Sequence, residues 1–206
     1  MELKNIPCYT RSNLELLLGD KKRTLDARLL SLRKKGKLIT LKRGYYLNNN
    51  YYSQTENKQN LLEYLSSLLV SPSYVSLEYA LASYGFLAES VYTITCVTTK
   101  KTRTIKNDLI NYNYHKISPK HYHSFISREF NDLQYSFATL EKSIWDLCYF
   151  TPLSSVGIKR EFLLGSRFNW GLLNKVQKSR LTQLLKDSKS SKMSSILDIL
   201  ITEGIL

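Results

Sequence analysis

The stretch that decides the fold of the N-terminal end reads KKRTLDARLLSLRKKGKLITLKRGYYL over residues 21–47. The apolar residues of its first half fall at i, i+4 and i+7 and share one helical face: Leu25, Leu29 and Leu32. This spacing predicts an amphipathic helix over Lys21–Lys35. Gly36 is placed to end that helix, because glycine adopts the left-handed cap conformation without steric cost.

A β-hairpin is predicted directly after Gly36. Two runs with β propensity, Leu38–Leu41 and Tyr45–Leu47, are separated by Lys42-Arg43-Gly44. A short connection that contains glycine between two such runs is typical of a hairpin. The predicted hairpin therefore has a basic tip.

A shorter helix is predicted ahead of this stretch. Ser12-Asn13-Leu14-Glu15 matches a capping box, in which the serine and glutamate side chains bind free N–H groups of the first turn. The helix should run over Asn13–Leu18 and stop at the turn dipeptide Gly19-Asp20. Helix, tight turn, basic helix and basic hairpin is the order of a winged helix-turn-helix.

The side of the second helix that faces away from the leucines is basic at both ends and small in the middle. At about 100° per residue, Arg23, Ala27 and Lys34 point outward. Thr24 and Arg28 lie on a flank of this face. A helix face of this shape can enter the major groove of duplex DNA without a clash.

Nine residues are the predicted DNA contacts. We expect the middle of the helix to approach base edges through Arg23, Thr24, Ala27 and Arg28. We expect contacts to phosphate from Lys21, Lys22, Lys34, Lys42 and Arg43. Leu30 is the one bulky apolar residue on the outward face, and its size argues against insertion of this face into the major groove.

Positive charge is concentrated in the same part of the chain. The 206 residues carry 30 Lys and Arg against 17 Asp and Glu, a formal charge of +13. Residues 1–50 contribute +8, residues 51–154 contribute none and residues 155–206 contribute +5. Such a cluster on a helical segment is expected of a protein that binds a polyanion. The alternative is that these helices are basic only because they are solvated, and that they have no nucleic-acid partner. The order of turn, basic helix face and basic hairpin tip disfavours this alternative.

The rest of the chain is predicted to combine strands and helices. Val91–Thr99 is almost wholly β-branched and aromatic and gives the strongest strand signal. An amphipathic helix should follow over Thr139–Phe150. The segment from about residue 155 should be helical, with Lys186–Lys192 as a flexible basic link between the last two helices.

The predicted fold class is therefore α+β. An N-terminal winged helix-turn-helix over residues 1–50 is followed by a mixed α/β domain over residues 51–206, which has a helical C-terminal end. The polar run Asn48–Asn50 is the predicted hinge between the two domains.

Cysteine usage and hydropathy predict a cytoplasmic protein with no membrane partner. Cys8, Cys96 and Cys148 are odd in number and far apart, which indicates buried free thiols in a reducing compartment. The first seven residues contain no apolar signal region. No uncharged apolar run approaches the roughly 18 residues that cross a membrane.

The sequence contains no catalytic motif, and we predict no catalytic residue, no metal site and no cofactor. It has no glycine-rich phosphate loop and no Gly-x-Ser-x-Gly motif. The three histidines, His115, His121 and His123, are not joined by the cysteines or carboxylates that would complete a zinc site. Lys142 and Asp146 are interpreted as an i,i+4 ion pair and not as part of a nuclease centre.

An ordered set of segments resembles AbiEi-type antitoxins over roughly residues 10–150. The set consists of Leu32–Tyr46, Tyr74–Leu81 ahead of Gly85, Val97–Thr99 and Ala138–Leu147. One departure is that the usual first helix of the N-terminal domain looks truncated, since only about eight residues precede Tyr9-Thr10-Arg11.

The resemblance implies a bacterial antitoxin from a type IV toxin–antitoxin, or phage-defence, operon. The cognate toxin of that family is a nucleotidyltransferase-like protein. The antitoxin would repress its own operon by binding double-stranded DNA at inverted repeats, while its C-terminal part opposes toxicity. We expect a monomer in solution that binds DNA cooperatively.

Two alternative functions stay open. The chain can be a winged-helix transcriptional regulator without a toxin partner, whose second domain senses a ligand or dimerises. It can also be a nuclease that uses the winged helix for targeting, in which case Glu141 is the residue to test.

Overall fold

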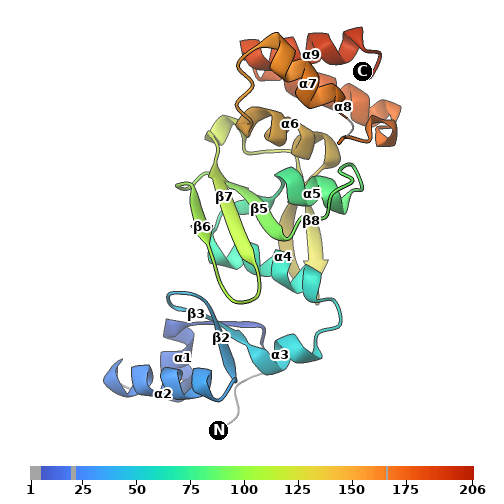
Figure 1. Cartoon of the computed structure of the whole chain (residues 1–206). Coiled ribbons are helices and arrows are strands. Elements are labelled where there is room, and N and C mark those ends of the chain that lie inside the picture. The colour runs from blue at the N-terminus through green and yellow to red at the C-terminus, as the bar shows by residue number, and fades with distance from the viewer. Residues whose placement is uncertain (1–5, 20–21, 166) are drawn as a thin grey trace.

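The computed structural model of the chain describes residues 6–19, 22–165 and 167–206. Within these ranges the fold is mixed α+β, with nine α-helices and two β-sheets. Figure 1 shows an elongated molecule in which the first fifty residues form one end and the C-terminal helices the other. The larger sheet and its covering helices lie between them.

Three short strands and two helices make up the N-terminal end. In chain order they are β1 (Cys8–Thr10), α1 (Arg11–Leu18), α2 (Lys22–Lys34), β2 (Leu38–Lys42) and β3 (Tyr45–Asn48). The strands pair antiparallel in the order β1-β3-β2, so the predicted hairpin is confirmed and gains a third strand. β1 was not predicted, because three residues are too few to show a period.

The predicted leucine stripe of α2 is confirmed. Leu25 and Leu29 are buried and Leu32 is partly buried against the same cluster. Gly19 and Gly36 have left-handed φ angles of 63° and 66°, as expected where α1 and α2 end.

The predicted cap of the first helix is wrong by two residues. α1 begins at Arg11, and the capping box joins Thr10 to Asn13 in place of Ser12 and Glu15. The Thr10 hydroxyl accepts from the Asn13 backbone N–H at 3.1 Å, and the Asn13 side chain accepts from the Thr10 N–H at 3.2 Å. The physical reason is that β1 pairs with β3, which holds Thr10 in the extended conformation that an N-cap needs.

The polar run predicted as a hinge, Asn48–Asn50, lies where β3 ends and the next helix begins. Asn48 is buried and caps α3 (Asn49–Gln54) by accepting from the backbone N–H groups of Asn50 and Tyr51 at 3.2 and 3.4 Å. Asparagine is a favoured N-cap because its short side chain satisfies these N–H groups. The predicted division of the chain at residue 50 stays a prediction.

The hairpin shares a hydrophobic core with the middle of the chain. Leu41 and Leu47 belong to the same buried cluster as Leu61 and Leu65 of α4 (Lys58–Leu69). The connection between the N-terminal end and the middle of the chain is therefore packed, and not a solvated tether.

The larger sheet has six strands in the order β6-β7-β5-β4-β9-β8. Two of its pairings, β5 with β7 and β4 with β9, are parallel and the others are antiparallel. The strands are β4 (Ser73–Val75), β5 (Thr93–Thr98), β6 (Arg103–Ile105), β7 (Asn111–Lys116), β8 (Phe125–Phe130) and β9 (Leu133–Ala138). The predicted strand at Val91–Thr99 is confirmed as β5.

Helices cover both faces of this sheet. One buried cluster joins the sheet to α4, and a second joins it to α5 (Leu77–Ser83), α6 (Leu140–Phe150) and the C-terminal helices. Figure 1 shows α4 on the side of the sheet toward the N-terminal end and α6 toward the C-terminal helices.

A buried polar bridge links α6 to β4 within this core. The Lys142 ammonium donates to Asp146 at 2.6 Å, which confirms the predicted i,i+4 pair, and both side chains are fully buried. The other Asp146 oxygen accepts from the Ser76 and Tyr74 hydroxyls at 2.7 and 3.1 Å. The carboxylate thus has a partner for each oxygen.

Three helices form the C-terminal end: α7 (Val156–Leu164), α8 (Lys175–Asp187) and α9 (Ser191–Thr202). The predicted flexible link over Lys186–Lys192 is too long, because α8 continues to Asp187 and α9 begins at Ser191. Lys192 is held in place by donating to the backbone carbonyls of Tyr149 and Thr151 at 2.7 and 3.0 Å.

Cys96 and Cys148 are buried free thiols, as predicted, whereas Cys8 is half-buried. In the part of the chain that the structure describes, none of the helices combines the length and apolar character of a membrane span.

Candidate nucleic-acid interface

Arg11 holds the two N-terminal helices and the hairpin together. Its backbone N–H donates to the Gly44 carbonyl at 2.8 Å, which places the start of α1 beside the hairpin tip. Its guanidinium pairs with Asp26 of α2 at 2.5 Å. This ion pair raises the pKa of the Arg11 guanidinium, first through the hydrogen bond to Asp26. One residue therefore contacts both the hairpin and α2.

The outward face of α2 lies open at the N-terminal end of the molecule. Arg23, Ala27 and Lys34 are exposed, and so is Thr24 on the flank. Arg28 is half-buried. The predictions for Lys21 and for the Lys22 side chain fall outside the described residues. Five of the nine predicted contacts are thus brought together along one helix.

The side chain of Lys42 is half-buried and makes its hydrogen bond within the molecule. The ammonium donates to the backbone carbonyl of Leu69 at the end of α4 and lies 4.1 Å from the centre of the Tyr45 ring. Burial, and then the nearby charge of Arg103, lower the pKa of Lys42. An ammonium that binds a carbonyl within the molecule is less available to phosphate, which argues against the predicted phosphate contact of Lys42.

Arg43 remains exposed at the hairpin tip. Sequence reasoning did not select three further exposed basic residues at the end of α2 and just beyond it: Arg33, Lys35 and Lys37. The signal was present as the run Arg33-Lys34-Lys35-Gly36-Lys37. Part of this charge has a structural role, since bases in the last turn offset the negative end of the helix dipole.

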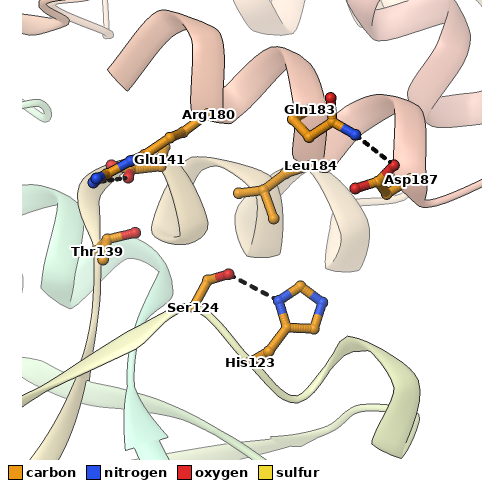
Figure 2. A pocket seen from close by; sticks show the side chains of 8 residues that line it. All are labelled: His123, Ser124, Thr139, Glu141, Arg180, Gln183, Leu184 and Asp187. Carbon is orange, nitrogen blue, oxygen red and sulfur yellow. Dashed lines mark hydrogen bonds and ion pairs between the residues drawn. The ribbon is translucent and has the colours of Figure 1, made fainter. Parts of the chain in front are cut away.

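A pocket of about 470 Å³ lies near the opposite end, between the start of β8, the start of α6 and the exposed side of α8. Its lining carries both signs of charge, as Figure 2 shows: His123, Ser124, Thr139, Glu141, Arg180, Gln183, Leu184 and Asp187. Arg180 pairs with the buried Glu141 at 3.5 Å, and Gln183 donates to Asp187 at 2.8 Å. The Arg180–Glu141 pair balances one charge of each sign and Asp187 adds a negative charge, so the pocket has no excess of positive charge for a polyanion.

The floor of the pocket places an imidazole beside a hydroxyl. His123 Nδ1 lies 2.8 Å from the Ser124 Oγ, and Ser124 has a left-handed φ of 62°. Burial lowers the pKa of His123, and the charge of Lys142 adds to this. Among the described residues no carboxylate is hydrogen-bonded to the imidazole, so a nucleophile–base–acid arrangement is not complete.

No protein-family model matches this chain, and no curated protein matches it either.

Proposed function

We propose that this chain is a DNA-binding transcriptional repressor whose α2 reads the major groove. The observation that carries the proposal is the exposed outward face of α2, which is basic at Arg23 and Lys34 and small at Ala27. It coincides with the part of the sequence where the positive charge is concentrated. Phosphate neutralisation supplies most of non-specific DNA affinity, and a narrow helix face reaches base edges.

The local arrangement supports a winged helix-turn-helix. α1 and α2 are joined by three residues that begin with Gly19, the length and composition typical of this motif. The hairpin of β2 and β3 follows α2 and pairs with β1. Arg23, Thr24 and Ala27 lie in the first half of α2, where a reading helix contacts bases. Among the described side chains, Lys34 and Arg43 are the exposed phosphate contacts that we propose.

A salt series tests these phosphate contacts. The double variant Lys34→Gln and Arg43→Gln removes two charges that we expect to release counterions on binding. On a random-sequence 30-base-pair duplex, the slope of log K against log salt should flatten by about two. Fluorescence anisotropy between 50 and 200 mM salt measures this slope.

Lys42→Gln is the matched control for that series. It removes one positive charge next to Arg43 on the hairpin, but this charge is bound to the Leu69 carbonyl. Its slope should equal that of the wild-type chain. An unchanged slope in the double variant would contradict the assignment of Lys34 and Arg43, and a flattened slope in Lys42→Gln would restore Lys42 as a phosphate contact.

We further propose that the protein is the antitoxin of a toxin–antitoxin operon and represses that operon. The support is the resemblance to AbiEi-type antitoxins, combined with where its segments fall. Tyr74 and Ser76 of the segment Tyr74–Leu81 donate hydrogen bonds to Asp146 of the segment Ala138–Leu147. Asp146 also pairs with Lys142 of its own segment. Segments that are about 70 residues apart thus form one buried network.

Co-expression tests the antitoxin role. The open reading frame next to this gene is expressed in a bacterial host with and without this chain, and growth is measured. We expect the neighbour alone to arrest growth and this chain to restore it. If the neighbour is not toxic, or if its toxicity persists in the presence of the chain, the protein is a regulator without a toxin partner.

A further inference from the structure

Leu30 lies in the middle of the outward face of α2. Together with Arg23, Ala27 and Lys34 it forms a series spaced at i, i+4, i+7 and i+11, which is one stripe on a helix. The Leu30 side chain is 49% exposed, and its three stripe neighbours are exposed as well. The stripe is therefore an apolar centre flanked by two cations.

Leu30 lies one turn beyond Ala27 on the same stripe, so a helix that enters the major groove along this stripe brings Leu30 to the base edges next to those that the first half of α2 contacts. Exposed leucines that are scattered singly over a surface need no partner. Leu30 differs from them because its neighbours on both sides are expected to meet DNA. Its side chain then loses water whatever base it meets. Most groups on the major-groove edges are hydrogen-bond donors and acceptors, and the apolar one is the C5 methyl group of thymine.

We infer that Leu30 is a specificity-determining residue that contacts a thymine methyl group, so that the protein prefers thymine at that position of its DNA site. The inference rests on the proposed function. Under this inference the apolar side chain of Leu30 favours DNA binding, whereas from the sequence alone its size argued against DNA binding. Burial of one methyl group corresponds to about a fourfold change in affinity.

The test uses 20-base-pair duplexes that the full-length wild-type chain selects from a random pool. Each thymine of a selected duplex is replaced in turn by deoxyuridine, which lacks the methyl group and keeps the hydrogen-bonding pattern. The dissociation constants of the two duplexes are compared for wild type and for Leu30→Ala. At one position, the wild-type chain should bind the uracil duplex about fourfold more weakly, whereas Leu30→Ala should bind both equally.

Leu16→Ala is the matched control, because Leu16 of α1 is 83% exposed and lies outside the stripe. It should keep the wild-type preference for thymine. Alanine favours helix, so both variants should fold, and circular dichroism checks this.

Each remaining outcome overturns the inference. If Leu30→Ala keeps the wild-type preference at every thymine, Leu30 does not read the methyl group, although the proposed function stands. If replacing thymine with deoxyuridine leaves the dissociation constant of the wild-type chain unchanged at every position, Leu30 again does not read the methyl group. If the wild-type chain enriches no duplex from the pool, the proposed function and this inference fail together.

Discussion

Replacing Asp146 with alanine is expected to lower the free energy of unfolding by about 3–5 kcal/mol. The reason is that Lys142, which is fully buried, would keep its charge or lose its proton without a counter-charge at 2.6 Å. The hydroxyls of Tyr74 and Ser76 would lose their acceptor in the same variant. Urea denaturation followed by tryptophan fluorescence measures the loss, since Trp145 lies beside the Lys142 ammonium.

Two further variants identify the charge as the cause. Lys142→Met with Asp146→Asn removes both charges and leaves an acceptor for Tyr74 and Ser76, so it should be clearly more stable than Asp146→Ala. Glu89→Ala breaks the exposed ion pair with Arg167 and should cost less than about 1 kcal/mol. A loss below about 1 kcal/mol in Asp146→Ala would contradict the role that we give to this bridge.

Charge reversal on α2 is expected to reduce DNA affinity about a thousandfold. The double variant Arg23→Glu and Lys34→Glu changes the charge of the outward face by four units. At about 1 kcal/mol for each unit charge near phosphate, the loss is about 4 kcal/mol. Binding to a random-sequence 30-base-pair duplex at 100 mM salt, measured by fluorescence anisotropy, gives the ratio.

Helix α8 offers a matched control at the opposite end of the molecule. Lys175 and Lys186 are exposed and lie in the first and last turns of a helix of 13 residues, as Arg23 and Lys34 do in α2. Lys175→Glu with Lys186→Glu makes the same change in charge and should reduce affinity less than about tenfold. An equal loss in both double variants would mean that binding follows the total charge and not the face of α2.

The predictions that succeeded depend on patterns within one segment. The stripe of Leu25, Leu29 and Leu32 has a period that belongs to a helix, and the run Val91–Thr99 has a composition that belongs to a strand. The hairpin was marked by two β-prone runs around Gly44. The fold class and the outward face of α2 could therefore be predicted from the sequence.

The cap of the first helix and the placement of the Lys42 side chain depend on partners that are distant in the sequence. Ser12 and Thr10 can each form a capping box with the residue three positions later, which is Glu15 for Ser12 and Asn13 for Thr10. The pairing of β1 with β3 makes Thr10 the N-cap. The Lys42 side chain faces inward because Leu69, 27 residues away, presents a free carbonyl. A basic residue at a turn looks solvated in the sequence, and its tertiary partner cannot be seen there.

The packed connection between the hairpin and α4 has a consequence for how two copies would share an operator. Leu41, Leu47 and the Lys42 bond to Leu69 join the hairpin to the middle of the chain, and the hairpin in turn packs against α2. A copy bound through α2, as proposed, would then project its sheet and C-terminal helices in one direction from the groove. If the protein binds two repeats as proposed, their helical phasing would decide whether neighbouring copies meet, since half a turn of extra DNA would carry one copy to the other side of the duplex.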